Sequence, residues 1–174
     1  MRDDAADYEL ISKWLTDSRV LEFYEGRDNP FPPARVREEY SPRALRGGGV
    51  TACILHCEER PVGYMQFYPV ASDDDRRSYG LDRADAGSNI FGADQFIGEP
   101  DYWNRGIGTR AVLLLVSYLF STQHAAAVVV DPHAGNGRAI RCYEKSGFRK
   151  IKILPGHELH EGALRDAWLM RADR

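Results

Sequence analysis

Apolar residues recur at helical spacing near the start of the chain. A helix is predicted over residues 4–16, with four apolar side chains on one face: Leu10, Ile11, Trp14 and Leu15. A second helix is expected to begin near Pro33, because proline favours the first helical turn. It carries Val36 and Tyr40 on one face and is disturbed at Pro42.

Extended patterns follow. The run Gly47–Gly49 ends the helical region, and residues 50–57 and 62–70 predict the two strands of a hairpin around Glu58-Glu59-Arg60-Pro61. Residues 71–87 are rich in Asp, Ser, Gly and Arg and predict a long loop, a kind of segment that is often functional.

The second half of the chain alternates strands and helices. The predicted strands lie at residues 88–98, 125–130, 149–154 and 164–170, and the predicted helices at residues 107–121 and 137–145. Gly147 is well placed as the C-cap of the predicted helix at residues 137–145. Helix 107–121 is expected to be buried on more than one side, with one face made by Ala111, Leu114, Leu115, Tyr118 and Leu119. The order of elements indicates an α/β fold with a mixed sheet, and residues 1–174 are expected to form one domain.

Composition narrows the class of protein. With 43% hydrophobic and 28% charged residues, the chain has the make-up of a globular protein. It has no apolar run long enough to span a bilayer and no signal-peptide pattern, so a cytoplasmic location and no membrane partner are expected. The net charge of -3 argues against a nucleic-acid partner. The cysteines, Cys53, Cys57 and Cys142, are expected to be reduced thiols.

Acidic residues gather in the middle third of the chain. They are Asp73, Asp74, Asp75, Asp82, Asp85, Asp94, Glu99 and Asp101. Such a cluster is either solvated surface or a region that attracts a cationic substrate.

The segment Trp103-Asn104-Arg105-Gly106-Ile107-Gly108-Thr109 comes just before a predicted buried helix. A helix N-terminus presents unpaired N–H groups that bind phosphate, and glycine lets a phosphate approach the backbone. Taken alone, the pattern fits a tight turn as well as a phosphate site. It is neither a dinucleotide fingerprint nor a Walker loop, because the third glycine and the Gly-Lys-Ser/Thr ending are missing.

A second segment, residues 136–148, follows the valine-rich strand. Helical spacing places Ala139, Cys142 and Tyr143 on one face, and periodicity alone favours a core position for the tyrosine. Together the two segments resemble the GNAT superfamily. The resemblance rests on R-G-x-G-[TA] opening a helix and on N-x-x-A-x-x-x-Y-x-x-x-G-F after a strand. Residues 92–100, Trp103, Asp131-Pro132 and Arg141–Lys145 are similar, more specifically, to the aminoglycoside 6'-N-acetyltransferases.

The resemblance implies that acetyl-CoA binds between two parallel strands that end near Gly98 and Val130, with no metal. The backbone N–H groups of five consecutive residues would hold the pyrophosphate: Arg105, Gly106, Ile107, Gly108 and Thr109. Backbone groups of Gln95, Phe96 and Ile97 would pair with pantetheine and polarise the thioester carbonyl. Asn136 would contact the cofactor arm.

The resemblance also assigns roles toward the acceptor, a polycationic aminoglycoside. Asp94 would bind the amine and accept its proton, Asp131 would position it, and Tyr143 would protonate the departing thiolate. Each residue has a plainer alternative: Asp94 as a surface carboxylate, Asp131 as a turn residue before proline, and Phe23 and Tyr24 as core rather than as aromatics against the sugar.

The chain departs from the superfamily pattern at two points, and two other functions stay open. Trp103 stands where the superfamily often has Gln or Arg, and the chain starts so near its first helix that the usual first strand is expected to be short or missing. His157 and His160 are expected to be solvated turn residues. The competing functions are a GNAT enzyme for another amine, such as N-hydroxylysine, a polyamine or a protein N-terminus, and a silent acyl-CoA-binding regulator. The protein is expected to be a monomer or a homodimer.

Overall fold

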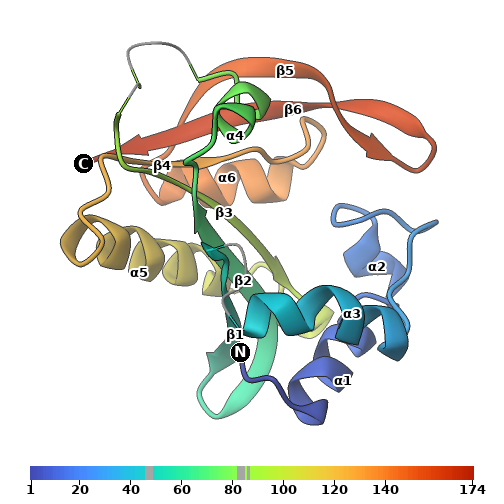
Figure 1. Cartoon of the computed structure of the whole chain (residues 1–174). Helices are drawn as coiled ribbons and strands as arrows, with labels where there is room; N and C mark the ends of the chain where they lie inside the picture. The colour runs from blue at the N-terminus through green and yellow to red at the C-terminus, as the bar shows by residue number, and fades with distance from the viewer. Residues whose placement is uncertain (46–48, 82–84, 86) are drawn as a thin grey trace. The chain divides into compact units, whose positions relative to one another are not determined.

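The computed structural model describes residues 1–45, 49–81, 85 and 87–174. The predicted positions Gly47, Gly48 and Asp82 lie outside these residues. The described strands form one six-stranded sheet in the order β1-β2-β3-β4-β6-β5 (Figure 1). The chain divides into two compact units, residues 1–67 with 94–107 and residues 68–93 with 108–174. We describe each unit by itself.

The first unit starts with helices and a hairpin. Its elements are α1 (Ala5–Trp14), α2 (Ser18–Leu21), α3 (Pro33–Ala44), β1 (Thr51–Cys57), most of β2 (Arg60–Pro69), the end of β3 (Ile90–Ile97) and the short 3-10 helix η3 (Pro100–Tyr102). Asp4 caps α1 by accepting a hydrogen bond from Asp7 N at 2.9 Å. Pro33 opens α3 and β1 pairs antiparallel with β2, both as predicted. Helix α2 is an addition to the prediction. Residues 1–4 form no strand, and the Met1 ammonium group donates to Ala52 O at 2.8 Å.

Aromatic side chains dominate the core of this unit. Trp14, Phe31, Tyr40 and Tyr64 are fully buried, together with the predicted helix residues Ile11, Leu15 and Val36. Gly98 is packed so closely against the Trp14 indole that a Cβ there would overlap the ring. Burial of this much apolar surface is the main stabilisation of the three helices, none of which is long enough to be stable alone.

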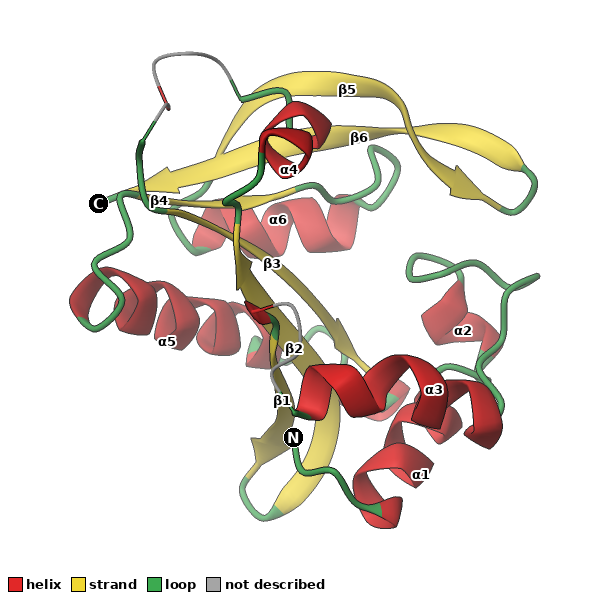
Figure 2. Cartoon of the chain, viewed as in Figure 1, coloured by secondary structure: helices red, strands yellow, loops and turns green. Residues whose placement is uncertain are grey.

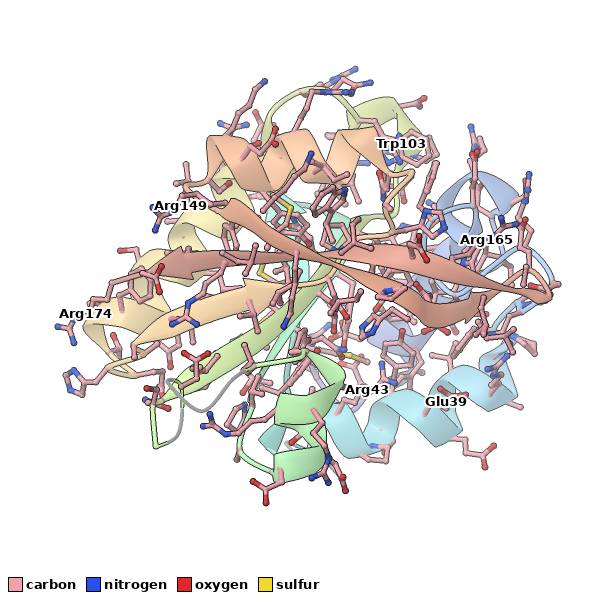
Figure 3. The ribbon with its side chains drawn as sticks, turned by 90° about the horizontal axis from the view of Figure 1, so that it is seen from above. Glu39, Arg43, Trp103, Arg149, Arg165 and Arg174 are labelled. Carbon is pink, nitrogen blue, oxygen red and sulfur yellow. The ribbon has the colours of Figure 1, made fainter. Side chains whose placement is uncertain are left out.

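The second unit is a sheet with helices on both faces. It holds α4 (Asp73–Ser78), the start of β3, nearly all of α5 (Ile107–Ser121), β4 (Ala127–Val130), α6 (Gly137–Lys145), β5 (Arg149–His160) and β6 (Ala163–Asp173). Residues Ile90–Gly92 of β3 pair in parallel with Ala127–Val129, while β6 pairs antiparallel with both β4 and β5. Helices α4 and α6 lie on opposite sides of the β5–β6 strands (Figures 2 and 3).

The predicted loop 71–87 is wrong in one part, because residues 73–78 form α4. Ser72 and Asp75 make a reciprocal capping box, in which each side chain accepts a hydrogen bond from the other residue's backbone N–H. The sequence signal for this helix was the Ser-x-x-Asp spacing, which the polar composition of the segment hides.

The predicted face of α5 is right at Leu115 and Leu119 and wrong at Leu114 and Tyr118. Its buried side is formed by Val112, Leu115 and Leu119, whereas Leu114 is 74% exposed. Leu113 and Tyr118 are exposed as well, so the helix is buried on one side only. A helix that is apolar all round gives no contrast between its faces, and periodicity then fails to choose the buried one.

The final hairpin is longer than predicted and irregular. Glu161 and Gly162, both with positive φ of 51° and 72°, form its two-residue turn, as a type I′ geometry requires. The register shifts between Leu154 and Glu158, so Pro155–His157 lie opposite the single residue Asp166. Arg149 and Arg165 mark opposite ends of the hairpin (Figure 3).

The described acidic residues of the middle third mostly have partners within their own units. Asp85 accepts a hydrogen bond from Arg171 Nη1 at 2.7 Å. Glu99 pairs with Lys13 and accepts from the Trp14 indole at 2.9 Å. Asp74 pairs with Arg77. Asp85 and Glu99 are therefore engaged within the fold, Asp74 pairs at the surface, and Asp94 is described with the candidate site below. In the described part of the chain, no helix has the length and apolar character needed to cross a bilayer.

Candidate active site

Asp94 lies on β3, and its carboxylate is held from the neighbouring strand. Gln66 on β2 donates from Nε2 to Asp94 Oδ2 at 2.7 Å. Tyr64, two residues back on the same face of β2, donates its hydroxyl to Gln66 Oε1 at 2.8 Å. The amide is therefore fixed from one side and orients the carboxylate on the other. Asp94 is half-buried.

The Gln66 amide also has a cationic neighbour. Arg43 of α3, labelled in Figure 3, approaches Gln66 Oε1 at 3.4 Å and lies over the Tyr40 ring at 4.4 Å. Burial raises the pKa values of Tyr40 and Tyr64 far above their usual range. Both phenols thus stay protonated at neutral pH, and Tyr64 remains a hydrogen-bond donor. None of Gln66, Tyr64 and Arg43 was predicted as a site residue. The signal available in the sequence was a glutamine in an otherwise apolar strand.

Phe96 links the site residues to the aromatic core. Its ring centroid lies 4.6 Å from that of Tyr24, 5.6 Å from Tyr64 and 6.0 Å from Trp14. Tyr24 is half-buried in this cluster, and burial raises the pKa of its hydroxyl. Tyr24 thus packs on the core, as its plainer alternative predicts, and its role toward an acceptor stays a prediction. Phe96 itself is buried.

The segment before α5 contains two residues with left-handed backbone conformation. Asn104 and Gly106 have positive φ values of 60° and 76°. A Cβ added at Gly106 would meet no atom within 4 Å, so the backbone there faces open space. Arg105 is exposed and lies over the Tyr102 ring at 5.3 Å. The Trp103 indole donates to Ile97 O at 2.7 Å, so this carbonyl is already engaged, although the resemblance implies a pantetheine contact near it.

The first turn of α5 is fixed against α6. Thr109 Oγ1 donates to Cys142 Sγ at 3.5 Å, and Ser146 Oγ donates to Thr109 O at 3.4 Å. The helix begins at Ile107, so the N–H groups of its first turn lack partners within the helix and carry the positive end of its dipole. These contacts connect Thr109, one of the predicted phosphate-binding residues, to α6.

Helix α6 carries two further predicted residues. Asn136 is its N-cap, buried, with Oδ1 accepting from Ala139 N at 3.0 Å. Tyr143 is buried and its ring lies 5.5 Å from that of Phe148. Gly147, with φ of 92°, ends the helix as predicted. Both Asn136 and Tyr143 thus have structural roles, which neither support nor oppose the roles that the resemblance implies.

Asp131, directly after β4, has a partner that the sequence did not predict. His157 Nε2 donates to Asp131 Oδ2 at 2.8 Å, and both side chains are about one-fifth exposed (19% and 24%). This hydrogen bond raises the pKa of His157 against the effect of partial burial. The expectation of solvated turn histidines is wrong, because His157 lies in β5 and His160 is buried. Asp131 and His157 are far apart in the sequence, and the fold of the β5–β6 hairpin brings them together.

The predicted residues thus fall into two groups. Residues 94–97, 105–107 and Tyr24 belong to the first unit, and residues 108–109, Asp131, Asn136 and Tyr143 to the second. Each group contains one predicted carboxylate that accepts a hydrogen bond. Asp94 accepts from the neutral Gln66 amide, and Asp131 accepts from the titratable His157 imidazole. All three cysteines are thiols. Among the described residues, no group of three or more His, Cys, Asp or Glu could hold a metal ion.

Comparison with known proteins places the chain. Residues 3–155 match the family described as acetyltransferase (GNAT) domain. Aminoglycoside N(6')-acetyltransferase type 1 from Klebsiella pneumoniae is 33% identical over 83% of this chain and 70% of its own length. The solved structure of AAC(6')-Ib in complex with ribostamycin and coenzyme A has a TM-score of 0.78 and 30% identity, over 100% of this chain and 90% of that one. N(6)-hydroxylysine O-acetyltransferase from Escherichia coli is 28% identical over 86% of this chain, which spans 45% of that protein.

The chain therefore belongs to the GNAT acetyltransferase family, with the mixed α/β sheet that the sequence predicted. It is an acetyl-CoA-dependent N-acetyltransferase, and within the family it is similar to the aminoglycoside 6'-N-acetyltransferases. Both statements agree with the resemblance found in residues 92–148.

Proposed function

We propose that the chain acetylates the 6'-amino group of aminoglycoside antibiotics in the cytoplasm, by direct transfer from acetyl-CoA, and so confers resistance. The observation that carries the proposal is the similarity to 6'-N-acetyltransferases over most of the chain, at 33% identity. The geometry adds two carboxylates, Asp94 and Asp131, each held by a hydrogen-bond donor. Carboxylates in this state suit a polycationic acceptor.

The turn before α5 fits a diphosphate. Gly106 places backbone next to open space, and the N–H groups of Arg105, Gly106, Ile107, Gly108 and Thr109 are the proposed ligands. Coenzyme A, when bound, supplies the activated acetyl group. The backbone of Gln95 and Phe96 is proposed to pair with the pantetheine arm and to polarise the carbonyl, and Asn136 to contact the arm from the start of α6.

Asp94 is the proposed general base. An ammonium group must lose a proton before its nitrogen can attack, and a carboxylate oriented by Gln66 can bind the ammonium form and take that proton, directly or through a water. Asp131 would hold a second position of the acceptor. Tyr24, partly buried beside Phe96, would lie against a sugar ring.

Tyr143 is the proposed general acid. Its phenol would donate a proton to the sulfur as the carbon–sulfur bond breaks, so that coenzyme A leaves as a thiol. Packing on Phe148 fixes the ring, which a proton donor requires, since a misplaced group transfers poorly. Holding both reactants in one site would supply much of the remaining acceleration.

A second candidate has one observation in its favour. The similarity to a hydroxylysine O-acetyltransferase extends over 86% of this chain. The alternative acceptor is therefore an N-hydroxylysine-type siderophore precursor, which carries one side-chain amine rather than several.

A thiol-release assay separates the candidates. The panel is kanamycin and tobramycin, a 6'-hydroxyl aminoglycoside as matched control, spermidine, lysine and N-hydroxylysine. Turnover of the 6'-amino compounds but not of the control is expected, and expression of the chain should raise the kanamycin concentration that inhibits growth. Turnover confined to the other amines would overturn the aminoglycoside assignment and keep the enzyme class. No turnover of any acceptor, with acetyl-CoA still bound, would favour a silent regulator.

A further inference from the structure

The feature that the proposed mechanism does not use is the histidine beside Asp131. The distance from His157 Nε2 to Asp131 Oδ2 is 2.8 Å, and each side chain is about one-fifth exposed. A carboxylate assigned to bind an ammonium group therefore already has a partner that can carry the same charge.

Both members of the pair are held by backbone structure. The segment after β4 continues along β6, since Trp168 N donates to Pro132 O at 3.0 Å and Ala134 N to Asp166 O at 2.8 Å. On β5, the bulge that contains His157 is fixed at Gly156, whose N–H donates to the Asp166 carboxylate at 2.9 Å. The two side chains therefore meet within one hydrogen-bonded framework of the second unit.

We propose that His157 is a positioning residue for the acceptor: protonated, it neutralises Asp131 in the empty enzyme, and an ammonium group of the acceptor replaces it. On this exchange the imidazolium gives its proton to solvent and keeps a neutral ring, while the ammonium group takes its place at the carboxylate. The inference rests on the proposed role of Asp131, and makes acceptor binding depend on pH through a residue that does not touch the reacting atoms.

The surrounding charges favour Asp131 as the partner. Among the described residues, the carboxylates that act on His157 are Asp131 and its neighbour Glu158, and the contact with Asp131 is the main cause that raises the pKa of His157. Glu158 also acts on His133 and pairs with His160, and the nearby Arg165 and Asp166 act on His133 as well. A histidine held this way is protonated over more of the range near neutral pH than an isolated one.

Steady-state kinetics with kanamycin test the exchange. For the wild type, the KM for kanamycin at about pH 6 should exceed that of His157→Gln by about two- to tenfold, the scale of a partly exposed ion pair. The two KM values should converge by about pH 8.5, where the wild-type histidine is neutral, as the glutamine of the variant is at every pH. His157→Lys, which stays charged, should keep a high KM at both pH values. The kcat values of the wild type and His157→Gln should stay within about twofold of each other. The matched control is His124→Asn, an exposed histidine with φ of 54°, which asparagine tolerates.

A KM ratio between wild type and His157→Gln that is the same at both pH values would overturn the proposal and leave His157 a structural residue. NMR titration of the five histidines gives a readout without turnover. Saturating kanamycin, with coenzyme A present, should lower the pKa of His157, and an unchanged value would equally overturn the exchange. An enzyme that acetylates only another amine would refute the aminoglycoside assignment, and the same titration with that amine would then decide the role of His157.

Discussion

The Gln66 amide donates to the Asp94 carboxylate at 2.7 Å, from a strand that lies 28 residues earlier in the chain. Replacement by Met keeps the size of the side chain and removes the donor. Gln66→Met is expected to lower kcat/KM for kanamycin by about tenfold, since a mobile carboxylate takes a proton less efficiently. The KM for acetyl-CoA should not change. Gln123→Met is the control, because Gln123 Nε2 donates only to the exposed Tyr118. Equal activity of the two variants would remove Gln66 from the site.

Loss of the charge at Asp94 should have a larger effect. Asp94→Asn is expected to lower kcat by about 10²- to 10⁴-fold, the scale of general acid–base catalysis, while acetyl-CoA still binds. Isothermal titration with acetyl-CoA and the thiol-release assay separate binding from transfer. Asp101→Asn, at an exposed aspartate of η3, should retain full activity. Near-normal turnover of Asp94→Asn would assign the base to another residue.

The role of Tyr143 is tested by removal of one oxygen atom. Tyr143→Phe should keep the packing on Phe148 and lower kcat by about ten- to a hundredfold. Tyr118→Phe, at an exposed position on α5, is the matched control. The rate should be followed as a function of pH, because loss of a general acid also changes the alkaline limb of the profile. A variant with the wild-type rate and profile would contradict the assignment.

Two glycines with the same backbone geometry distinguish a ligand effect from strain. Gly106 and Gly162 have φ values of 76° and 72°, and a Cβ at either would meet nothing within 4 Å. Alanine at each should cost about 1 kcal/mol of stability through the positive φ. Only Gly106→Ala should raise the KM for acetyl-CoA, by about tenfold or more, because its methyl group would occupy the proposed phosphate position. Equal KM values in the two variants would place the diphosphate elsewhere.

Glu99 should make the stability of the first unit depend on acid pH. Partial burial acts to raise its pKa, but the hydrogen bonds and ion pair from Lys13 and Trp14 prevail, and the pKa lies below the usual value of 4.5. The stabilisation is thus fully present above about pH 4.5 and lost as the pH falls through the lower folded-state value. Glu99→Gln should lower the Tm at neutral pH, with the difference from wild type shrinking in acid. The exposed Glu9→Gln should show no such difference; a gap that stays constant with pH would mean that the charge of Glu99 does not matter.

The sequence predicted the elements that have a strong local signal. The helix at residues 5–14, the hairpin of β1 and β2, and the helix that begins at Ile107 all follow from periodicity, proline position and turn residues. It missed α4, whose residues are as polar as a loop, and it assigned the buried face of α5 only in part, because the residues of that helix are apolar all round. Local pattern decides where an element lies, and tertiary packing decides which side of it is covered.

The candidate site divides in the same way. Asp94, Asp131 and Tyr143 were found through motifs that stand in short, contiguous segments. Gln66 and His157, which hold the two carboxylates, come from strands 28 and 26 residues away in sequence. No spacing rule links such pairs, since their contact depends on strand pairing and on a register shift.

The bulge in β5, residues Pro155–His157, is a segment whose length can vary. Regular pairing resumes on both sides of Pro155–His157, so the length of this segment can change without disturbing the ladder around it. Deletion of Pro155 and Gly156 would restore one-to-one pairing and put His157 opposite Asp166, on the ladder and off the carboxylate of Asp131. With the proposed role of Asp131, a change of two residues in this hairpin would create or abolish the counter-ion of that carboxylate. The proposed pH dependence of acceptor binding would change with it, while the residues proposed for acetyl transfer would stay the same.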